Sequence, residues 1–193
     1  ARELLTTRLF WHKYSEQAGE GTRGFSSRDH FNALKLVCAT MKGLEIQDRD
    51  GNPNLKETEV NGDGLQIVRW RRFEIESYLV HPTALERFVE RKVGAGAASA
   101  QHRADLAKHF ADNYPPPFLA DPFSDPPYLK NSKARTELLP PALTAAGLPA
   151  IPYTEYFEIA DVMTPQEVHP EVKQKLDSIC RAFGVDPAPG TKP

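Results

Sequence analysis

The fold class is indicated most clearly by the residues Leu44-Glu45-Ile46-Gln47-Asp48-Arg49-Asp50-Gly51. Residues 44–47 are predicted to form a short strand that delivers Asp48 and Asp50 to a loop at its carboxyl end. Downstream, the turn signal Asn61-Gly62-Asp63-Gly64 precedes a second predicted strand, residues 65–70. Upstream, a helix is predicted to start at Ser26 or Ser27 and to end before Gly43. Its predicted apolar face consists of Phe31, Leu34, Val37, Cys38 and Met41. This order predicts an α/β sheet whose ligands gather beyond the carboxyl ends of its strands.

The composition limits the class of protein. The chain has 193 residues, of which 40% are hydrophobic and 26% charged, so it can bury a core and is neither membrane-embedded nor disordered. No apolar run approaches the roughly 20 residues of a membrane-spanning helix, and we expect a cytoplasmic protein. The net charge of −2 is unusual for a free-standing DNA binder. A nucleic-acid partner would therefore need a local patch, a metal ion or another domain.

Asp48 and Asp50 are candidate metal ligands, because two carboxylates just after a strand suit Mg²⁺ or Mn²⁺ and offset the charge of a phosphate substrate. The ordinary alternative is a structural turn. An EF-hand count places Asp48, Asp50, Asn52 and Glu59 at ligand positions, but Pro53 stands where that loop needs glycine. A phosphatase or glycosyl-transfer site could also use the pair.

A second acidic segment follows about two dozen residues later: Trp70-Arg71-Arg72-Phe73-Glu74-Ile75-Glu76-Ser77-Tyr78-Leu79. Together with Asp48-Arg49-Asp50-Gly51, it resembles the C-terminal Toprim domain of OLD-family (overcoming lysogenization defect) ATP-dependent nucleases. Members carry an Asp-X-Asp pair and then a Glu-Ile-Glu-Asn-Tyr-Leu-like segment close to a Trp, and Ser77 replaces the usual Asn. The resemblance covers mainly residues 44–90.

The resemblance implies metal-dependent cleavage of DNA phosphodiesters. Asp48 and Asp50 would be metal ligands, and Glu74 and Glu76 would supply a further ligand or a supporting carboxylate. Independently, four carboxylates near one point would repel each other without cations. The alternative for Glu74 and Glu76 is a solvated helix face, although residues i and i+2 do not share one face.

Cationic side chains near this segment are candidates for contacts with DNA. The resemblance implies a lysine near the scissile phosphate, and Lys133 fits that role with Lys130 as its competitor. Arg69, Arg71 and Arg72 could bind the DNA backbone or could form a polar strand edge. The six histidines show no metal-ligand spacing. Cys38 and Cys180 have the surroundings of buried thiols.

The resemblance also implies a preceding strand with a Glu and an Asp, which the sequence does not contain, so either it precedes Ala1 or this chain lacks it. No P-loop occurs, and we expect an ATPase domain elsewhere in the same protein. The expected fold is a Toprim-like parallel sheet flanked by helices, with a helical insertion or appended lobe. Residues 1–80 would form the core, 81–128 a helical insertion with a proline-rich segment, and 129–193 the rest of the core and the C-terminal helices. The proline-rich segment, residues 114–128, is predicted to be irregular.

The expected function is that of a metal-dependent DNA endonuclease with one or two Mg²⁺ or Mn²⁺ ions. The expected partners are DNA, the ATPase domain of the same protein and a second copy of the chain in a homodimer. One alternative is a catalytically inactive Toprim-like module that binds DNA or a partner. Another is a metal-dependent phosphohydrolase with Asp48 as nucleophile.

Overall fold

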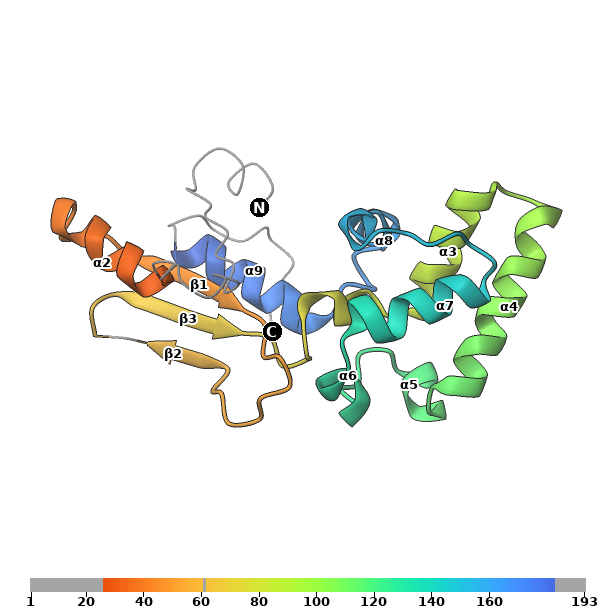
Figure 1. Ribbon diagram of the computed structural model, residues 1–193, viewed down its shortest axis with the longest axis horizontal. Coiled ribbons are helices and arrows are strands. Elements are labelled where there is room, and N and C mark those ends of the chain that lie inside the picture. Colours follow the sequence, from red (N-terminus) through yellow and green to blue (C-terminus); the bar gives the residue numbers. More distant parts are fainter. Residues whose placement is uncertain (1–25, 61, 183–193) are drawn as a thin grey trace, which may run out of the picture. The chain divides into compact units, whose positions relative to one another are not determined.

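The computed structural model describes residues 26–60 and 62–182 (Figure 1). The chain divides into two compact units. The sheet unit contains residues 26–47, 56–60, 62–69 and 174–182 of the described chain. The helical unit is formed by Asp48–Leu55 and Trp70–Lys173. The boundaries differ from those expected after residues 80 and 128. The helical unit already includes residues 70–80, and residues 129–173 belong to it as well.

A small mixed sheet forms the centre of the sheet unit. Its strands β1 (Gly43–Gln47), β2 (Thr58–Val60) and β3 (Leu65–Arg69) have the order β1-β3-β2. Strand β1 pairs parallel with β3, whereas β2 pairs antiparallel with β3. The α/β class and the two predicted strands are therefore confirmed. The expectation of an all-parallel sheet is wrong, because the short strand β2 was not anticipated.

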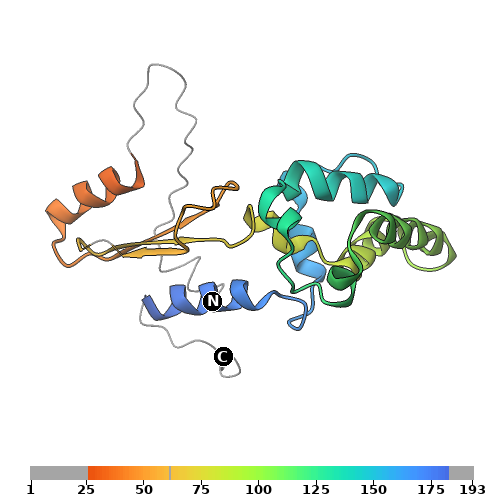
Figure 2. The same ribbon diagram turned by 90° about the horizontal axis from the view of Figure 1, so that it is seen from below.

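Helices α2 (Ser27–Val37) and α9 (Pro170–Ala182) flank this sheet. Figure 2 shows the sheet edge-on, with α2 on one side and α9 on the other. A capping box opens α2, in which Asp29 N donates to Ser26 Oγ and Asp29 Oδ2 accepts from Ser26 N, both at 3.1 Å. Phe31 of α2 packs against Leu65 and Ile67 of β3.

Only part of the predicted apolar face of α2 is buried. Phe31 belongs to the core, whereas Val37 is 90% exposed and Cys38 is also exposed. The expectation of two buried thiols is thus wrong for Cys38 and confirmed for Cys180. Cys38 is the C-cap of α2 and follows Leu36 and Val37, which are also exposed, so the end of this helix lies outside the core.

The helical unit is built around two longer helices, α3 (Pro82–Val93) and α4 (Ala97–Asn113). Shorter helical segments complete it: η1 (Ile75–Leu79), α5 (Pro116–Ala120), α6 (Pro127–Asn131), η2 (Ala134–Leu138), α7 (Leu139–Ala145), η3 (Tyr153–Glu155) and α8 (Phe157–Val162). Helix α3 packs against α4 and α8, and α4 packs against α7 (Figure 1).

Fully buried side chains from these helices form one continuous core. Leu85 and Phe88 of α3 meet Leu106 and Phe110 of α4, and Ile159 of α8 belongs to the same cluster. Burial of each such side chain contributes about 1.5–3 kcal/mol of transfer free energy. The unit is therefore held by an ordinary hydrophobic core that does not include the acidic residues.

The proline-rich segment is more regular than expected. Residues 114–128 were predicted to be irregular, yet they form α5 and the start of α6. Pro116 and Pro127 occupy first-turn positions of these helices, where the missing N–H leaves no hydrogen bond unmade.

Within the described ranges, none of the helices combines the length and the apolar character that crossing a membrane requires.

Candidate functional site

A tight turn after β1 is hydrogen-bonded to the second acidic segment. The backbone N–H groups of Arg49 and Asp50 both donate to the carbonyl oxygen of Phe73, at 3.2 and 3.1 Å. The backbone N–H of Ile75 donates to Asp48 Oδ1 at 3.1 Å. All of these residues belong to the helical unit. The two motifs that the sequence analysis grouped are thus in direct contact.

The conformation of this turn depends on Asp50 and Gly51. Both have positive φ angles, 49° and 70° respectively. A Cβ atom at Gly51 would lie 2.8 Å from Phe73 Cε2, so only glycine lets the turn approach the aromatic ring. Asp50 is one of the few non-glycine residue types that adopts this conformation at low cost. The turn therefore displays two exposed carboxylates, those of Asp48 and Asp50.

Asp48 is destabilised in its charged form. Its pKa is raised to about 6, mainly by the surrounding protein and also by the carboxylates of Glu76, Asp50 and Glu74, while the hydrogen bond from Ile75 N acts in the opposite direction. The residue still keeps contact with solvent. The outer edge of the carboxyl group is thus accessible, while its other side is enclosed by protein and faces like charges.

Glu74 is almost completely buried and joins the acidic segment to η2. Its Oε1 accepts a hydrogen bond of 2.6 Å from Arg135 N, and its Oε2 lies 3.8 Å from Arg135 Nε. Burial raises the pKa of Glu74, whereas Arg135 and Lys133 act in the opposite direction. Glu74 therefore fixes the start of a π-helical turn next to the acidic residues. Sequence reasoning missed Arg135, although it lies two residues after Lys133.

Glu76 is partly exposed and is close enough to act on several neighbours. Its charge raises the pKa of Asp48, of Glu74 and of the buried Tyr156. Tyr156 was not anticipated as a neighbour of the site, because the two residues are far apart in the sequence. The structure thus brings all four predicted carboxylates into one region of the helical unit.

Lys133 also lies beside this region. Its Nζ is 5.8 Å from the centre of the Phe73 ring, and its charge acts on Glu74. The side chain is exposed, as a residue that meets a phosphate must be. Lys130 is exposed on α6, and within the described residues no hydrogen bond or ion pair joins it to these carboxylates.

The three arginines do not form the expected cluster. Arg69, in the sheet unit, is buried and donates to Gln47, to the carbonyl of Lys56 and to Glu59. Arg72, in the helical unit, is 1% exposed and donates to Asp125 and to three backbone carbonyls.

These contacts correct the expectation that Arg69 and Arg72 bind DNA, because both guanidinium groups are occupied inside the protein. Arg71 is the one of the three with a partly exposed side chain, and its Nε lies 3.1 Å from Glu171 Oε2. Tyr78 also donates to Glu171, which ties the acidic segment to the start of α9.

The donor set suits a hard divalent cation, because it consists of carboxylate oxygens that repel one another. Within residues 26–60 and 62–182, however, no three His, Cys, Asp or Glu side chains converge closely enough to form a ready metal-binding group. This arrangement still fits Mg²⁺, which usually keeps several waters and binds through one or two carboxylates together with substrate phosphates. The histidines contribute no ligand group in the same ranges.

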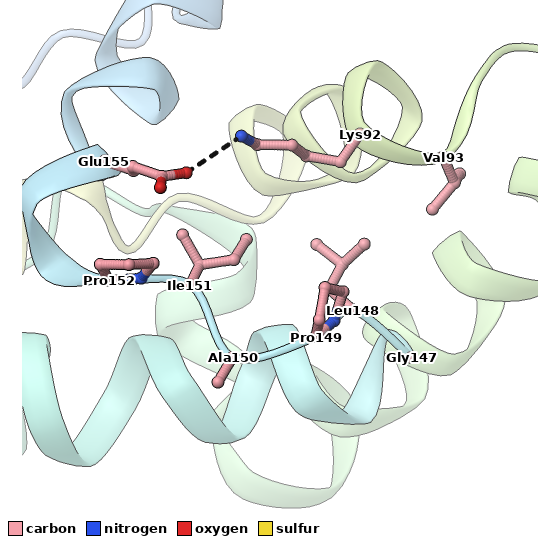
Figure 3. A pocket seen from close by; sticks show the side chains of 9 residues that line it. All are labelled: Lys92, Val93, Gly147, Leu148, Pro149, Ala150, Ile151, Pro152 and Glu155. Atoms are coloured by element: carbon pink, nitrogen blue, oxygen red, sulfur yellow. Dashed lines mark hydrogen bonds and ion pairs between the residues drawn. The ribbon is translucent and has the colours of Figure 1, made fainter.

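A separate cavity of about 260 Å³ lies between the end of α3 and the segment that leads into η3. Apolar side chains line most of it, including Val93, Leu148 and Ile151. Figure 3 shows Lys92 pointing toward Glu155 at its rim, where their charged groups are 3.4 Å apart. None of the predicted site residues lines this cavity.

No known protein family matches the chain, and neither the curated proteins nor the solved structures contain a significant match to it.

Proposed function

We propose that the helical unit is a divalent-metal-dependent endonuclease that hydrolyses phosphodiester bonds of DNA. The observation that supports this most directly is the hydrogen-bonded junction between the turn at Asp48 and the segment at Glu74. Through it, two acidic motifs that are distant in the sequence share one solvent-accessible region. An arrangement of like charges that costs free energy in the folded protein is typical of a site that binds a counter-charge.

Asp48, Asp50 and Glu76 are the proposed oxygen ligands. Each belongs to the open part of the region, and Asp48 and Asp50 are exposed. A bound Mg²⁺ or Mn²⁺ ion would neutralise the phosphate and would lower the pKa of a coordinated water. Glu74 is assigned mainly a positioning role, because one of its oxygens already accepts from Arg135 N.

Lys133 is proposed to contact the phosphate. Its ammonium group is exposed and lies on the Phe73 ring beside the carboxylates. A fixed cation at this place stabilises the additional negative charge that develops on a phosphate under attack by water. Lys133 would therefore affect the rate of cleavage more than the binding of the metal.

The wider assignment rests on the resemblance to OLD-family nucleases. It comprises a Toprim-like core, an ATPase domain elsewhere in the same protein, a homodimer and a cytoplasmic location. These parts are proposed together with the activity.

The first test is cleavage of supercoiled plasmid DNA by the chain with Mg²⁺ or Mn²⁺, compared with EDTA. Asp48→Ala and Asp50→Ala are expected to reduce cutting on the order of a hundredfold, because each removes a metal ligand. The matched control is Asp112→Ala, which removes an exposed carboxylate that pairs with Lys108 on α4. Cutting that persists in EDTA, or that Asp48→Ala leaves unchanged, would contradict the proposal.

A second candidate function is a module that binds DNA without cutting it. The absence of a three-residue metal group from the described part of the chain favours it. Binding of plasmid DNA in Mg²⁺ with no nicked product, and equal binding by Asp48→Ala, would support this second function.

A further inference from the structure

Two large aromatic side chains are exposed close to the acidic region. Tyr153 is 55% exposed and Phe157 is 61% exposed. They lie four residues apart, on successive helical turns formed by η3 and α8. Tyr156 and Ile159 of the same segment are buried, so the segment is anchored while the two aromatic rings remain in solvent. Exposed aromatic side chains on a fixed backbone indicate a binding surface.

Cationic side chains border this aromatic pair. The guanidinium carbon of Arg135 lies 5.6 Å from the centre of the Tyr153 ring, in cation–π contact. Lys133 is exposed two residues earlier in the chain. The nearby acidic residues Glu155 and Glu158 are paired with Lys92, at 3.4 and 3.0 Å. The surface therefore combines aromatic rings with two cationic side chains, Arg135, which also pairs with Glu74, and the exposed Lys133.

The same residues connect the aromatic pair to the carboxylates. Arg135 contacts Tyr153 on one side and Glu74 on the other. The hydroxyl of Tyr156 donates to the carbonyl of Arg135 at 3.4 Å, and the charge of Glu76 raises the pKa of Tyr156. All of these residues belong to the helical unit. The aromatic pair and the acidic region are consequently neighbouring parts of one surface.

We propose that Tyr153 and Phe157 are a stacking platform for the unpaired bases of a nucleic acid strand, whose phosphates meet Arg135 and Lys133. Bases that stack on aromatic rings beside cations are the common means of binding single strands without sequence preference. Bases within a duplex have no free faces and cannot use such a platform. The proposal deepens the proposed nuclease function, on which it rests for the choice of nucleic acid as ligand, and it assigns the site an unpaired substrate.

The test is binding of a labelled oligothymidylate of about 16 nucleotides to the chain, measured by fluorescence anisotropy in EDTA so that no cleavage occurs. Tyr153→Ala and Phe157→Ala are each expected to weaken binding about fivefold or more, because each removes one stacked base. Tyr153→Phe keeps the ring and should bind like the wild type. Val37→Ala is the matched control, because it removes an exposed apolar side chain in the sheet unit.

A second measurement uses Phe157→Trp, whose indole fluorescence should be quenched by oligothymidylate and by oligouridylate but not by a duplex of equal length. Three results would overturn the proposal: equal affinity for duplex and single strand, unchanged binding by Tyr153→Ala, or no binding by the wild type. If the wild type does not bind oligothymidylate, a protein partner would be left as the occupant of the aromatic pair. Binding is measured without metal and is therefore independent of cleavage. If the wild type binds oligothymidylate through these rings but does not cut DNA with Mg²⁺ or Mn²⁺, the nuclease function alone is refuted. Cleavage with no effect of Tyr153→Ala on binding would refute the platform alone.

Discussion

Asp48 shows how folding and the proposed chemistry conflict at a single residue. Its carboxyl group accepts one hydrogen bond from Ile75 N, yet its surroundings raise its pKa to about 6 from the ordinary value of 3.8. Folding therefore favours the protonated form. The contribution of this group to stability is fully present below about pH 3.8 and is lost as the pH rises through about 6.

Asp48→Asn is therefore expected to increase the free energy of unfolding at neutral pH while it abolishes metal-dependent cutting. The amide oxygen can still accept from Ile75 N, and the like-charge repulsion disappears. Urea unfolding in EDTA, measured from about pH 4 to pH 7, checks this. The gain should be small at the acidic end and should grow as the pH rises through about 6. A variant that is less stable than the wild type at neutral pH would refute this account of Asp48.

At the level of elements, the turn from Asp48 to Gly51 is the part that joins the two acidic motifs. Two backbone donors hold it to Phe73 O, and the Phe73 ring lies against Gly51. The turn needs a left-handed backbone at consecutive residues, which the Asp-Gly pair provides. Its geometry therefore depends on the residue types at positions 50 and 51 more than on any side-chain contact.

Gly51→Ala should reduce the free energy of unfolding by roughly 2 kcal/mol, because left-handed backbone costs alanine about 1 kcal/mol and the Phe73 ring must shift. Gly62→Ala is the control, since a Cβ atom there meets nothing within 4 Å. Its effect should stay within about 0.5 kcal/mol. Denaturant unfolding of both variants gives the comparison, and equal effects would show that the packing of Gly51 on Phe73 is unimportant.

Elements with a strong local pattern could be predicted from the sequence, and those defined by distant partners could not. Helix α2 follows from the Ser26 cap and from Phe31. Strand β1 follows from its alternating apolar and polar residues, and β3 from the apolar residues after a turn signal. Strand β2 has three residues and pairs only because β3 lies beside it, so no local signal marks it.

The same distinction applies to the candidate site. The grouping of Asp48 with Glu74 followed from motif order, and the structure places them in one region. The contact between Glu74 and Arg135 N joins residues 61 positions apart, and no spacing rule predicts it. The burial of Arg72 was missed because arginine is ordinarily exposed, and its partners, Asp125 and the carbonyls near it, come from a different segment.

On the scale of the whole molecule, Arg72 connects the acidic segment to the proline-rich segment. It is 1% exposed, and its donors reach Asp125 and the carbonyls of Ser77, Pro122 and Ser124. The guanidinium carbon also lies 4.9 Å from the centre of the Tyr78 ring. One buried cation thus holds together parts of the helical unit that are about 50 residues apart in sequence.

Arg72→Met should destabilise the helical unit by about 3–5 kcal/mol, because it leaves Asp125 and three carbonyls without this donor. The comparison is Arg103→Met, whose ion pair with Glu90, at 3.9 Å, joins two side chains that are each more than a third exposed. Its cost should be about 1 kcal/mol or less. Thermal unfolding followed by circular dichroism measures both, and a similar loss for the two variants would contradict the assigned role of Arg72.

The helical unit takes residues from two separate stretches of chain, Asp48–Leu55 and Trp70–Lys173. Every member of its hydrophobic core comes from the longer stretch. The shorter stretch supplies acidic groups and no core side chain, so its composition can vary at little cost to folding. For protein engineering, residues 48–55 are therefore a place to exchange one surface loop for another, provided that residues 49 and 50 keep their backbone N–H groups and position 51 remains glycine.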